Sequence, residues 1–291
     1  MSVMDLRALE IFQTVVAEGS VSKAAVKLNR VQSNISTRIK QLEIQVGKQL
    51  FYRQNRKLTL TSDGELLLSY ANKLIDLSLE AKEALGENSP KGVFRIGAME
   101  STAAARLPEI LAHYSASYPD VEIELQTGTA GALMQRLAKG EIEVAFIAEP
   151  VVGQNIQTQP VFVENLVLIA PASYPKITGF EALDGKTLIA FEQGCAYRSY
   201  LEGWLKDANV SPGNVLSVSS YLAIFACVAA GTGFAVVPQS ILNMIISTAE
   251  FQKIPLADDF AKIRTMLAHG TGYSSVKLDS FKKFLPKGLS T

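Results

Sequence analysis

The pattern of apolar and polar residues between Ser20 and Val46 predicts two short helices separated by a turn. The first runs from about Ser20 to Leu28, and the second ends before Gly47, a typical C-terminal stop. Asn29 lies between them, where a left-handed backbone is expected. The predicted buried positions are Val21, Ala24, Ala25 and Leu28 in the first helix and Val31, Ile35, Ile39, Leu42 and Val46 in the second. Such a pair is typical of a helix-turn-helix.

The second helix keeps a polar outer face. Gln, Asn, Ser and Thr side chains can hydrogen-bond base edges in the major groove, whereas Lys and Arg neutralise phosphates. The outer positions are Gln32, Ser33, Asn34, Ser36, Thr37, Arg38 and Lys40. The sequence therefore predicts a DNA-reading helix, and the alternative is a solvated helix pair in a protein that binds no DNA.

A β-hairpin is predicted directly after these helices, within Gln49–Thr61. A first strand leads into a basic loop, and Leu58–Leu60 forms the second strand. Arg53, Arg56 and Lys57 would then lie along phosphates or in the minor groove, as in a winged helix. The alternative is an ordinary charged hairpin tip.

Charge is unevenly distributed along a chain whose formal net charge is zero. Up to Thr61 there are ten Lys and Arg residues but only four Asp and Glu residues, a net charge of about +6. The remainder of the chain must be acidic by the same amount. A cationic head on an acidic body favours a nucleic-acid-binding module joined to a domain with another task.

A long helix without proline is predicted over Ser62–Leu85. Ser62 and Glu65 have the spacing of a capping box at its start. Apolar residues repeat at spacings of three and four: Tyr70, Leu74, Leu77, Ala81 and Ala84, with Leu67, Ala71 and Leu85 beside them. This seam predicts dimerisation through a second copy of the helix, and the alternative is packing within the same chain. Residues 87–91 are the predicted hinge.

From Gly92 onward, short apolar runs alternate with helices, which predicts an α/β body of two lobes with buried, mainly parallel strands. The predicted strands are Val93–Ala98, Val121–Gln126, Val144–Ala148, Leu166–Ala170, Leu188–Phe191 and Phe234–Val237. Leu107–Ser117 and Ala132–Lys139 are predicted helices. The longest apolar stretch, Tyr221–Ile246, contains Gly, Pro and polar residues and is predicted to be a helix, a turn, a buried strand and a second helix, not a membrane span.

Ligands of open α/β sheets usually bind beyond the carboxyl ends of strands, where helices begin. Ser101 and Thr102 follow the first strand, residues 128–130 follow the second, and residues 193–198 follow Leu188–Phe191. Hydroxyl groups and free amides there could hold a small anion, and Arg198 could clamp a carboxylate. The alternative is that the hydroxyl residues are only helix caps and Arg198 is a surface ion-pair partner.

Length, cysteine content and the N-terminus narrow the class of protein further. The chain has 291 residues, which usually divide into two or three domains. Two cysteines are too few for a secreted disulfide framework, and Cys227 lies in an apolar run typical of a core thiol. The charged N-terminal residues do not resemble a signal peptide, so a cytoplasmic location without a membrane partner is expected.

The sequence resembles the LysR-type transcriptional regulators of bacteria over nearly its whole length. The most specific segment is LRALEIFQTVVAEGSVSKAAVKLNRVQSNISTRIKQLEIQVGKQLFYRQNRKLTLTSDGELLL. Two looser segments, YPDVEIELQTGTAGALMQRLAKGEIEVAFI and VAAGTGFAVVP, follow in the body. Relatives usually have Ser before the first Gln of the recognition helix, whereas this chain has Val31.

The resemblance implies an α/β protein with an N-terminal winged helix-turn-helix at 1–61, a linker helix and hinge at 62–91, and a periplasmic-binding-protein-like effector domain at 92–291. Lobe I would comprise 92–162 and 267–291, and lobe II 163–266. The implied partners are an interrupted DNA palindrome, a second copy through Tyr70, Leu74, Leu77 and Ala81, tetramers of such dimers, a small-molecule effector and, as a candidate, RNA polymerase. The implied cleft residues are Ser101, Thr102, Thr129, Gln193, Arg198 and Ser220. A carboxylate or amino-acid-like effector is the expectation from Arg198.

Two other functions are weighed against this one. An enzyme is disfavoured because His113 and His269 lack metal-ligand or nucleophile spacing and no phosphate-binding or dinucleotide motif occurs, so no cofactor or metal is expected. The second alternative keeps DNA binding but makes Cys195 a redox sensor. Cys195 lies at a predicted helix start near Arg198, where the pKa of a thiol tends to fall.

Overall fold

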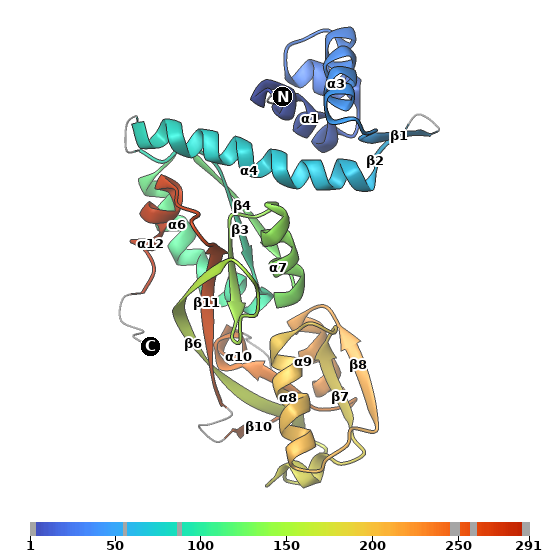
Figure 1. Cartoon of the computed structure of the whole chain (residues 1–291). Helices are drawn as coiled ribbons and strands as arrows, with labels where there is room; N and C mark the ends of the chain where they lie inside the picture. Colours follow the sequence, from blue (N-terminus) through green and yellow to red (C-terminus); the bar gives the residue numbers. More distant parts are fainter. Residues whose placement is uncertain (1–3, 55–56, 86–88, 245–250, 257–260, 287–291) are drawn as a thin grey trace. The chain divides into compact units, whose positions relative to one another are not determined.

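The computed structural model of the protein describes residues 4–54, 57–85, 89–244, 251–256 and 261–286, without the side chains of 53–54, 57, 76, 79–80 and 82–85. It consists of two compact units (Figure 1). The smaller unit is formed mainly by residues 1–89 and the larger mainly by residues from Pro90 onward. Short segments around residues 140 and 275 are grouped with the smaller unit.

The smaller unit is a helix-turn-helix followed by a hairpin and a long helix. Its elements are α1 (Leu6–Glu18), α2 (Val21–Lys27), α3 (Gln32–Val46), β1 (Phe51–Gln54), β2 (Lys57–Leu60) and α4 (Ser62–Leu85). Asp5 and Ser20 cap α1 and α2 through their side chains. Leu9, Phe12 and Leu42 form the centre of a core to which α1, α2, α3, β1 and α4 contribute.

The helix-turn-helix agrees closely with the prediction. Asn29 has a φ of 50° in the turn, and Gly47 ends α3 in the left-handed conformation with a φ of 69°. One predicted core position is wrong: Val31 is 69% exposed because it precedes α3 as its N-cap residue and does not reach the buried face. It makes no side-chain capping hydrogen bond, since valine has no acceptor.

The hairpin pairs Phe51 with Leu60 and Gln54 with Lys57 in antiparallel register. Arg56 and the side chains of Arg53 and Lys57 lie outside the described residues, so their roles stay predictions.

The predicted capping box of α4 is wrong by one residue. The Oγ1 atom of Thr61, not Ser62, accepts the backbone N–H of Gly64 at 2.9 Å. Thr61 also donates to the carbonyl of Gln49 at 2.7 Å, which fastens the helix start to the hairpin.

Helix α4 has two apolar faces with different surroundings. Ala71 and Ile75 are buried in the core of the smaller unit, so Ala71 packs within the chain and not at the predicted seam. Tyr70 and Leu77 are more than half exposed, Leu74 is 39% exposed and Ala81 is exposed. The side chains of the predicted seam residues Ala84 and Leu85 lie outside the described residues. The exposed face forms an apolar stripe within the smaller unit.

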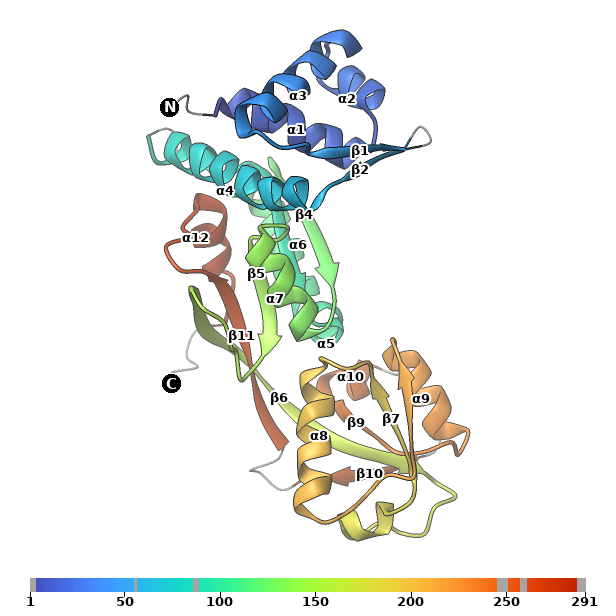
Figure 2. The ribbon, with the colours of Figure 1, turned by 45° about the vertical axis from the view of Figure 1, so that its right-hand side comes forward.

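The larger unit contains two lobes joined by long strands (Figure 2). Its strands are β3 (Gly92–Ala98), β4 (Val121–Thr127), β5 (Val144–Ala148), β6 (Ile156–Pro171), β7 (Thr187–Phe191), β8 (Asn214–Val218), β9 (Ala235–Pro238), β10 (Phe251–Pro255) and β11 (Lys262–Gly270). Its helices are α5 (Glu100–Ala105), α6 (Leu107–Ser117), α7 (Ala130–Lys139), the short 3-10 helix η1 (Phe180–Leu183), α8 (Ala196–Asp207), α9 (Tyr221–Ala229), α10 (Gln239–Met244) and α12 (Val276–Lys282).

Strand β6 belongs to both lobes. Residues 156–165 pair with β11, which continues through β5 to β3 and β4, whereas residues 166–171 pair with β9 and β10. Strands β7 and β8 form a separate parallel pair in the second lobe. The prediction of parallel strands is confirmed for β3, β4 and β5 and for β7. It is wrong for the rest of the body, because every pairing of β6 and β11 is antiparallel. The predicted Tyr221–Ile246 elements match α9, β9 and α10 as far as the structure describes them.

A buried ion pair connects α5 to β6. Glu164 is fully buried and accepts the Nε of Arg106, which follows α5, at 2.6 Å. Ser240 of α10 donates to the other carboxylate oxygen of Glu164 at 2.7 Å. A buried carboxylate is tolerated only when charge and hydrogen bonds compensate its desolvation. Arg106 and Ser240 thus attach the end of α5 and the start of α10 to β6.

We expect Arg106→Met to destabilise the larger unit by about 3 kcal/mol, because it leaves the buried Glu164 carboxylate without its cation. Glu164→Gln should cost less, about 1–2 kcal/mol, since the amide keeps hydrogen-bonding capacity without a charge. The only tryptophan, Trp204, lies in α8 of this unit. Urea titration followed by its fluorescence therefore reports on this unit, and equal midpoints for wild type and Arg106→Met would contradict the expectation.

Candidate DNA-contact surface and ligand cavity

The outer face of α3 is exposed as the sequence predicts, because Ile35, Ile39 and Leu42 take the buried face. Ser36 is half-buried, and the other six candidate residues are exposed: Gln32, Ser33, Asn34, Thr37, Arg38 and Lys40. They cover the first two and a half turns of the helix. The face combines short polar side chains near its start with two cations further along, which suits contacts to bases and to phosphates respectively.

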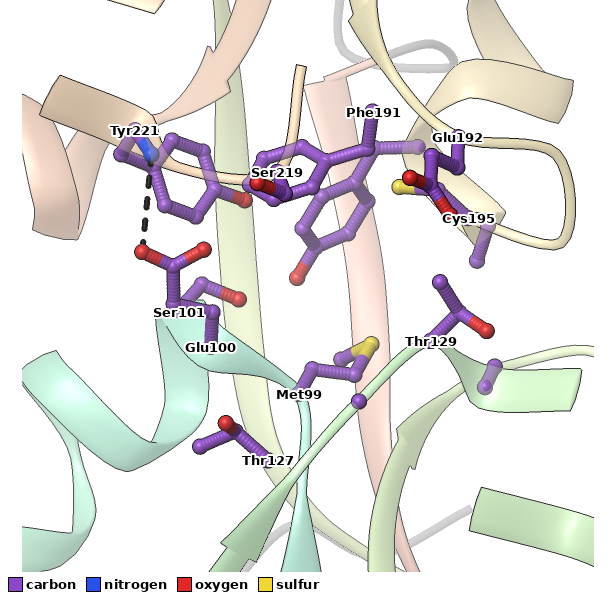
Figure 3. Close-up of a pocket in the computed structure, with 14 residues that line it drawn as sticks. Met99, Glu100, Ser101, Thr127, Thr129, Phe191, Glu192, Cys195, Ser219 and Tyr221 are labelled. Carbon is purple, nitrogen blue, oxygen red and sulfur yellow. Dashed lines mark hydrogen bonds between the residues drawn. The ribbon is translucent and has the colours of Figure 1, made fainter. Parts of the chain in front are cut away.

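The larger unit contains a cavity of about 430 Å³ between its lobes, where β3, β4 and β7 end (Figure 3). The first lobe contributes Met99, Glu100, Ser101, Thr127, Gly128, Thr129 and Ala130. The second contributes Phe191, Glu192, Cys195, Ala196, Tyr197, Ser219 and Tyr221. The cavity is large enough for a small metabolite and lies where ligands of such sheets bind.

Two of the six predicted cleft residues, Ser101 and Thr129, line this cavity. Thr102 is completely buried behind the wall. Gln193 is exposed and does not line the cavity. Ser220 caps α9 by accepting the backbone N–H of Leu222 at 3.2 Å, while its neighbours Ser219 and Tyr221 face the cavity.

Arg198 does not line the cavity, because its guanidinium group is engaged elsewhere. Its Nε donates to Glu202 at 2.7 Å, and its Nη1 donates to the carbonyl of Phe191 at 3.0 Å and to Ser217 at 3.3 Å. Arg198 forms an ion pair, as the alternative supposed, but its side chain is only 11% exposed and does not lie on the surface. The clamp on which the expected carboxylate effector depended is therefore not at the cavity.

Glu100 is the half-buried charge of the cavity, and sequence reasoning missed it. Its carboxylate accepts the backbone N–H of Tyr221 at 3.5 Å, across from one lobe to the other (Figure 3). Burial raises the pKa of Glu100, and the hydrogen bond from Tyr221 lowers it in part. Glu100 directly precedes Ser101, so the expectation that ligands bind beyond the carboxyl ends of strands could have included it. The tertiary fold decides which of the side chains at a strand end face the cavity.

Two hydroxyl groups at the cavity, those of Ser101 and Tyr197, are buried without a hydrogen bond of ordinary geometry among the described residues. Ser101 is 1% and Tyr197 4% exposed, and neither hydroxyl makes a hydrogen bond of ordinary geometry there. They are near enough for Ser101 to lower the pKa of Tyr197, although burial raises that pKa strongly overall. Burial also raises the pKa of Tyr221, so both phenols are neutral at physiological pH. Unsatisfied buried hydroxyls are costly unless water or a ligand pairs with them.

Cys195 faces the cavity as a free thiol, and the expectation of a lowered pKa is wrong. Burial raises the pKa of Cys195 by more than the backbone N–H groups of Arg198 and Tyr197 and the charge of Arg198 lower it. Cys227 is also a free thiol, packed against the core formed by α9 and its neighbouring strands. The premise of the redox alternative, an easily ionised thiol, is therefore not met.

The histidines lie apart from the cavity lining. His113 is exposed, and His269 is buried with its Nδ1 3.1 Å from the carbonyl of Gly270. Burial lowers the pKa of His269. Among the residues that the structure describes, no group of three or more His, Cys, Asp and Glu could hold a metal ion. No helix in the described ranges is long and apolar enough to cross a membrane.

Comparison with known proteins identifies the family. Residues 6–65 match the family described as bacterial regulatory helix-turn-helix protein, lysR family, and residues 87–290 match the LysR substrate binding domain. The chain is 37% identical over 264 residues to the HTH-type transcriptional regulator GltR of Bacillus subtilis, covering 90% of this chain and 89% of that protein. It is 36% identical to the regulator CzcR of Bacillus thuringiensis, covering 96% of both.

Solved structures share the fold. A full-length OxyR variant from Pseudomonas aeruginosa aligns with a TM-score of 0.78 at 21% identity and covers all of both chains. Full-length CbnR in complex with its target DNA aligns with a TM-score of 0.66 at 21% identity, covering 97% of this chain and 99% of that one. The relatives are transcriptional regulators, not enzymes. The protein belongs to the LysR family of bacterial transcriptional regulators, with a helix-turn-helix and an effector-binding domain.

We expect the Cys195 thiol to react with iodoacetamide several-fold more slowly than N-acetylcysteine at pH 8, because a raised pKa leaves little thiolate. The measurement is intact-mass spectrometry over time on a Cys227→Ser variant, so that only Cys195 is counted. A rate above that of N-acetylcysteine would return the redox sensor to consideration.

Proposed function

We propose that the protein reads DNA through the outer face of α3 and that a small molecule bound in the interlobe cavity modulates this binding. The observation that carries the proposal is the cavity itself, whose buried wall includes the unpaired hydroxyls of Ser101 and Tyr197. A folded protein rarely leaves such groups without a partner unless a ligand or water supplies it. Family membership supports DNA binding as the activity that the effector modulates, since LysR regulators bind DNA and form oligomers.

Effector action follows from linkage between two sites. A ligand that contacts both lobes binds one degree of lobe closure more tightly, and it can shift the equilibrium only by that difference in affinity. If lobe closure alters DNA affinity, DNA must alter ligand affinity by the same factor. Fluorescence anisotropy of labelled promoter DNA, titrated with and without a saturating cavity ligand, tests this, and identical curves would refute modulation of DNA binding.

On the same proposal, the cations of the hairpin, Arg53, Arg56 and Lys57, contact phosphates, and the exposed stripe of α4 joins two copies. Tetramers, contact with RNA polymerase and a cytoplasmic location remain part of the proposal by resemblance to the family.

Gln32→Ala should reduce the preference for the operator over unrelated DNA by about 1–3 kcal/mol if Gln32 contacts a base edge. Lys40→Ala is the matched control on the same helix face. It should weaken binding to both DNAs alike and reduce the slope of log K against log salt by about 0.9 for one lost phosphate contact. Competition titrations at two salt concentrations separate the two effects. Equal loss on both DNAs for Gln32→Ala would remove it from the base-reading set.

Leu74→Asp should dissociate the dimer, because a carboxylate in an apolar helix interface is desolvated without a partner. Sedimentation equilibrium measures the mass, and circular dichroism checks that the chain still folds. Ser62→Asp introduces the same single negative charge at an exposed position of α4 outside the proposed seam and should leave the mass unchanged. An unchanged mass for Leu74→Asp would place the interface elsewhere.

A further inference from the structure

The charges around the cavity have one sign. Glu100 and Glu192 line it, and none of the described lining residues is Lys, Arg or His. We propose that the effector is a small organic cation, a primary ammonium group on an apolar body, held by Glu100. The inference rests on the proposed function, because it names the ligand class of the same cavity.

Glu100 provides the negative charge in the partly buried wall of the cavity. It is half-buried, and the one hydrogen bond at its carboxylate in the described structure, from the Tyr221 N–H at 3.5 Å, is long and engages only Oε1. Burial raises the pKa of Glu100, and the hydrogen bond from Tyr221 lowers it only in part. An ammonium group would supply the missing positive charge, and charge-assisted hydrogen bonds are about twice as strong as neutral ones. Glu192 lies at the exposed rim, where solvent screens its charge.

The unpaired hydroxyls provide further acceptors. An ammonium group has three N–H donors, and a carboxylate alone does not use all of them in one geometry. The Ser101 hydroxyl belongs to the residue next to Glu100, and Ser101 is close enough to both Tyr197 and Tyr221 to lower the pKa of each phenol. One carboxylate and adjacent hydroxyls therefore form an acceptor group on the cavity wall.

Aromatic rings provide the apolar part of the wall. Phe191 and Tyr221 pack edge to face, with their ring centroids 4.8 Å apart, and both line the cavity with Tyr197 and Met99. Figure 3 shows Glu100 beside Tyr221, joined to it by the hydrogen bond, and Phe191 above Met99. Ring faces attract cations, and the rings and the thioether of Met99 would bury a hydrocarbon body.

An anionic ligand fits less well, although helix starts surround the cavity. At the start of α9, Glu100 accepts the N–H of Tyr221 and Ser220 accepts that of Leu222. The starts of α5 and α8 have no side-chain cap. At the start of α7, Thr129 accepts the N–H of Ala132 at 3.3 Å. Arg198 is committed to Glu202 and to the Phe191 carbonyl. A carboxylate effector would thus face Glu100 without a cation to offset the repulsion.

The test uses three probes that share one phenyl frame: phenethylamine, phenethyl alcohol and hydrocinnamate. Isothermal titration of the full-length protein should give at least about tenfold tighter binding for the amine than for the alcohol or the carboxylate. Glu100→Gln, which keeps the shape and an acceptor for Tyr221, should weaken amine binding at least about tenfold and leave the alcohol unaffected. Glu122→Gln is the matched control and should change amine affinity by less than about twofold, because Glu122 is exposed and does not line the cavity.

Tighter binding of hydrocinnamate, failure of the amine to bind, or equal amine affinity for wild type and Glu100→Gln would each overturn the proposal. Thermal unfolding of Glu100→Gln, followed by Trp204 fluorescence, shows whether the variant is folded.

The affinity for promoter DNA tests the proposed function separately. If hydrocinnamate binds best and changes promoter affinity, the effector site stands and only the ligand class fails. If the amine binds through Glu100 but leaves promoter affinity unchanged, the ligand class stands and modulation of DNA binding fails.

Discussion

The antiparallel pairing of β6 with β11 is the constraint on which the larger unit depends. Both strands continue from one lobe toward the other, so the lobes are joined by backbone hydrogen bonds and not by a single flexible link. This pairing turns the ends of β3 and β4 toward the end of β7, and the cavity lies between them. Glu164 on β6, with Arg106 and Ser240, fixes α5 to the same strand. The helix that carries Glu100 and Ser101 is therefore anchored at its far end.

The polar groups of the cavity differ in how completely they are satisfied. At Glu164 a buried carboxylate has a cation and a hydroxyl donor, as a structural ion pair requires. At Glu100 a half-buried carboxylate has one long backbone hydrogen bond, and nearby hydroxyls have no partner among the described residues. Two carboxylates in one unit thus have opposite characters. The satisfied one stabilises the fold, and the unsatisfied one is available to a ligand.

In the smaller unit, the same helix serves two purposes through opposite faces. Ala71 and Ile75 complete the core around Phe12 and Leu42, and Thr61 fixes the start of α4 to the hairpin. Tyr70, Leu74 and Leu77 remain on the exposed side. A substitution on the exposed face of α4 can therefore alter dimerisation without removing core contacts. The position of α3 does not depend on that face.

The sequence by itself determined the features that depend on local periodicity and backbone conformation. Examples are α3 with its polar face, the left-handed Asn29 and Gly47, the full extent of α4, and Leu107–Ser117 as a helix. It missed β8, β10 and β11, whose side chains are partly exposed and lack a continuous apolar run. Because β10 and β11 are antiparallel partners of β6, the antiparallel pairing was missed with them. Only the tertiary structure decided which residues beyond a strand end face the cavity. Arg198 and Glu100 both lie near such ends, but Arg198 turns to Glu202 whereas Glu100 lines the cavity. The rotation of each helix start and the position of neighbouring acceptors decide this difference. Local spacing in the sequence encodes neither the rotation nor the acceptors.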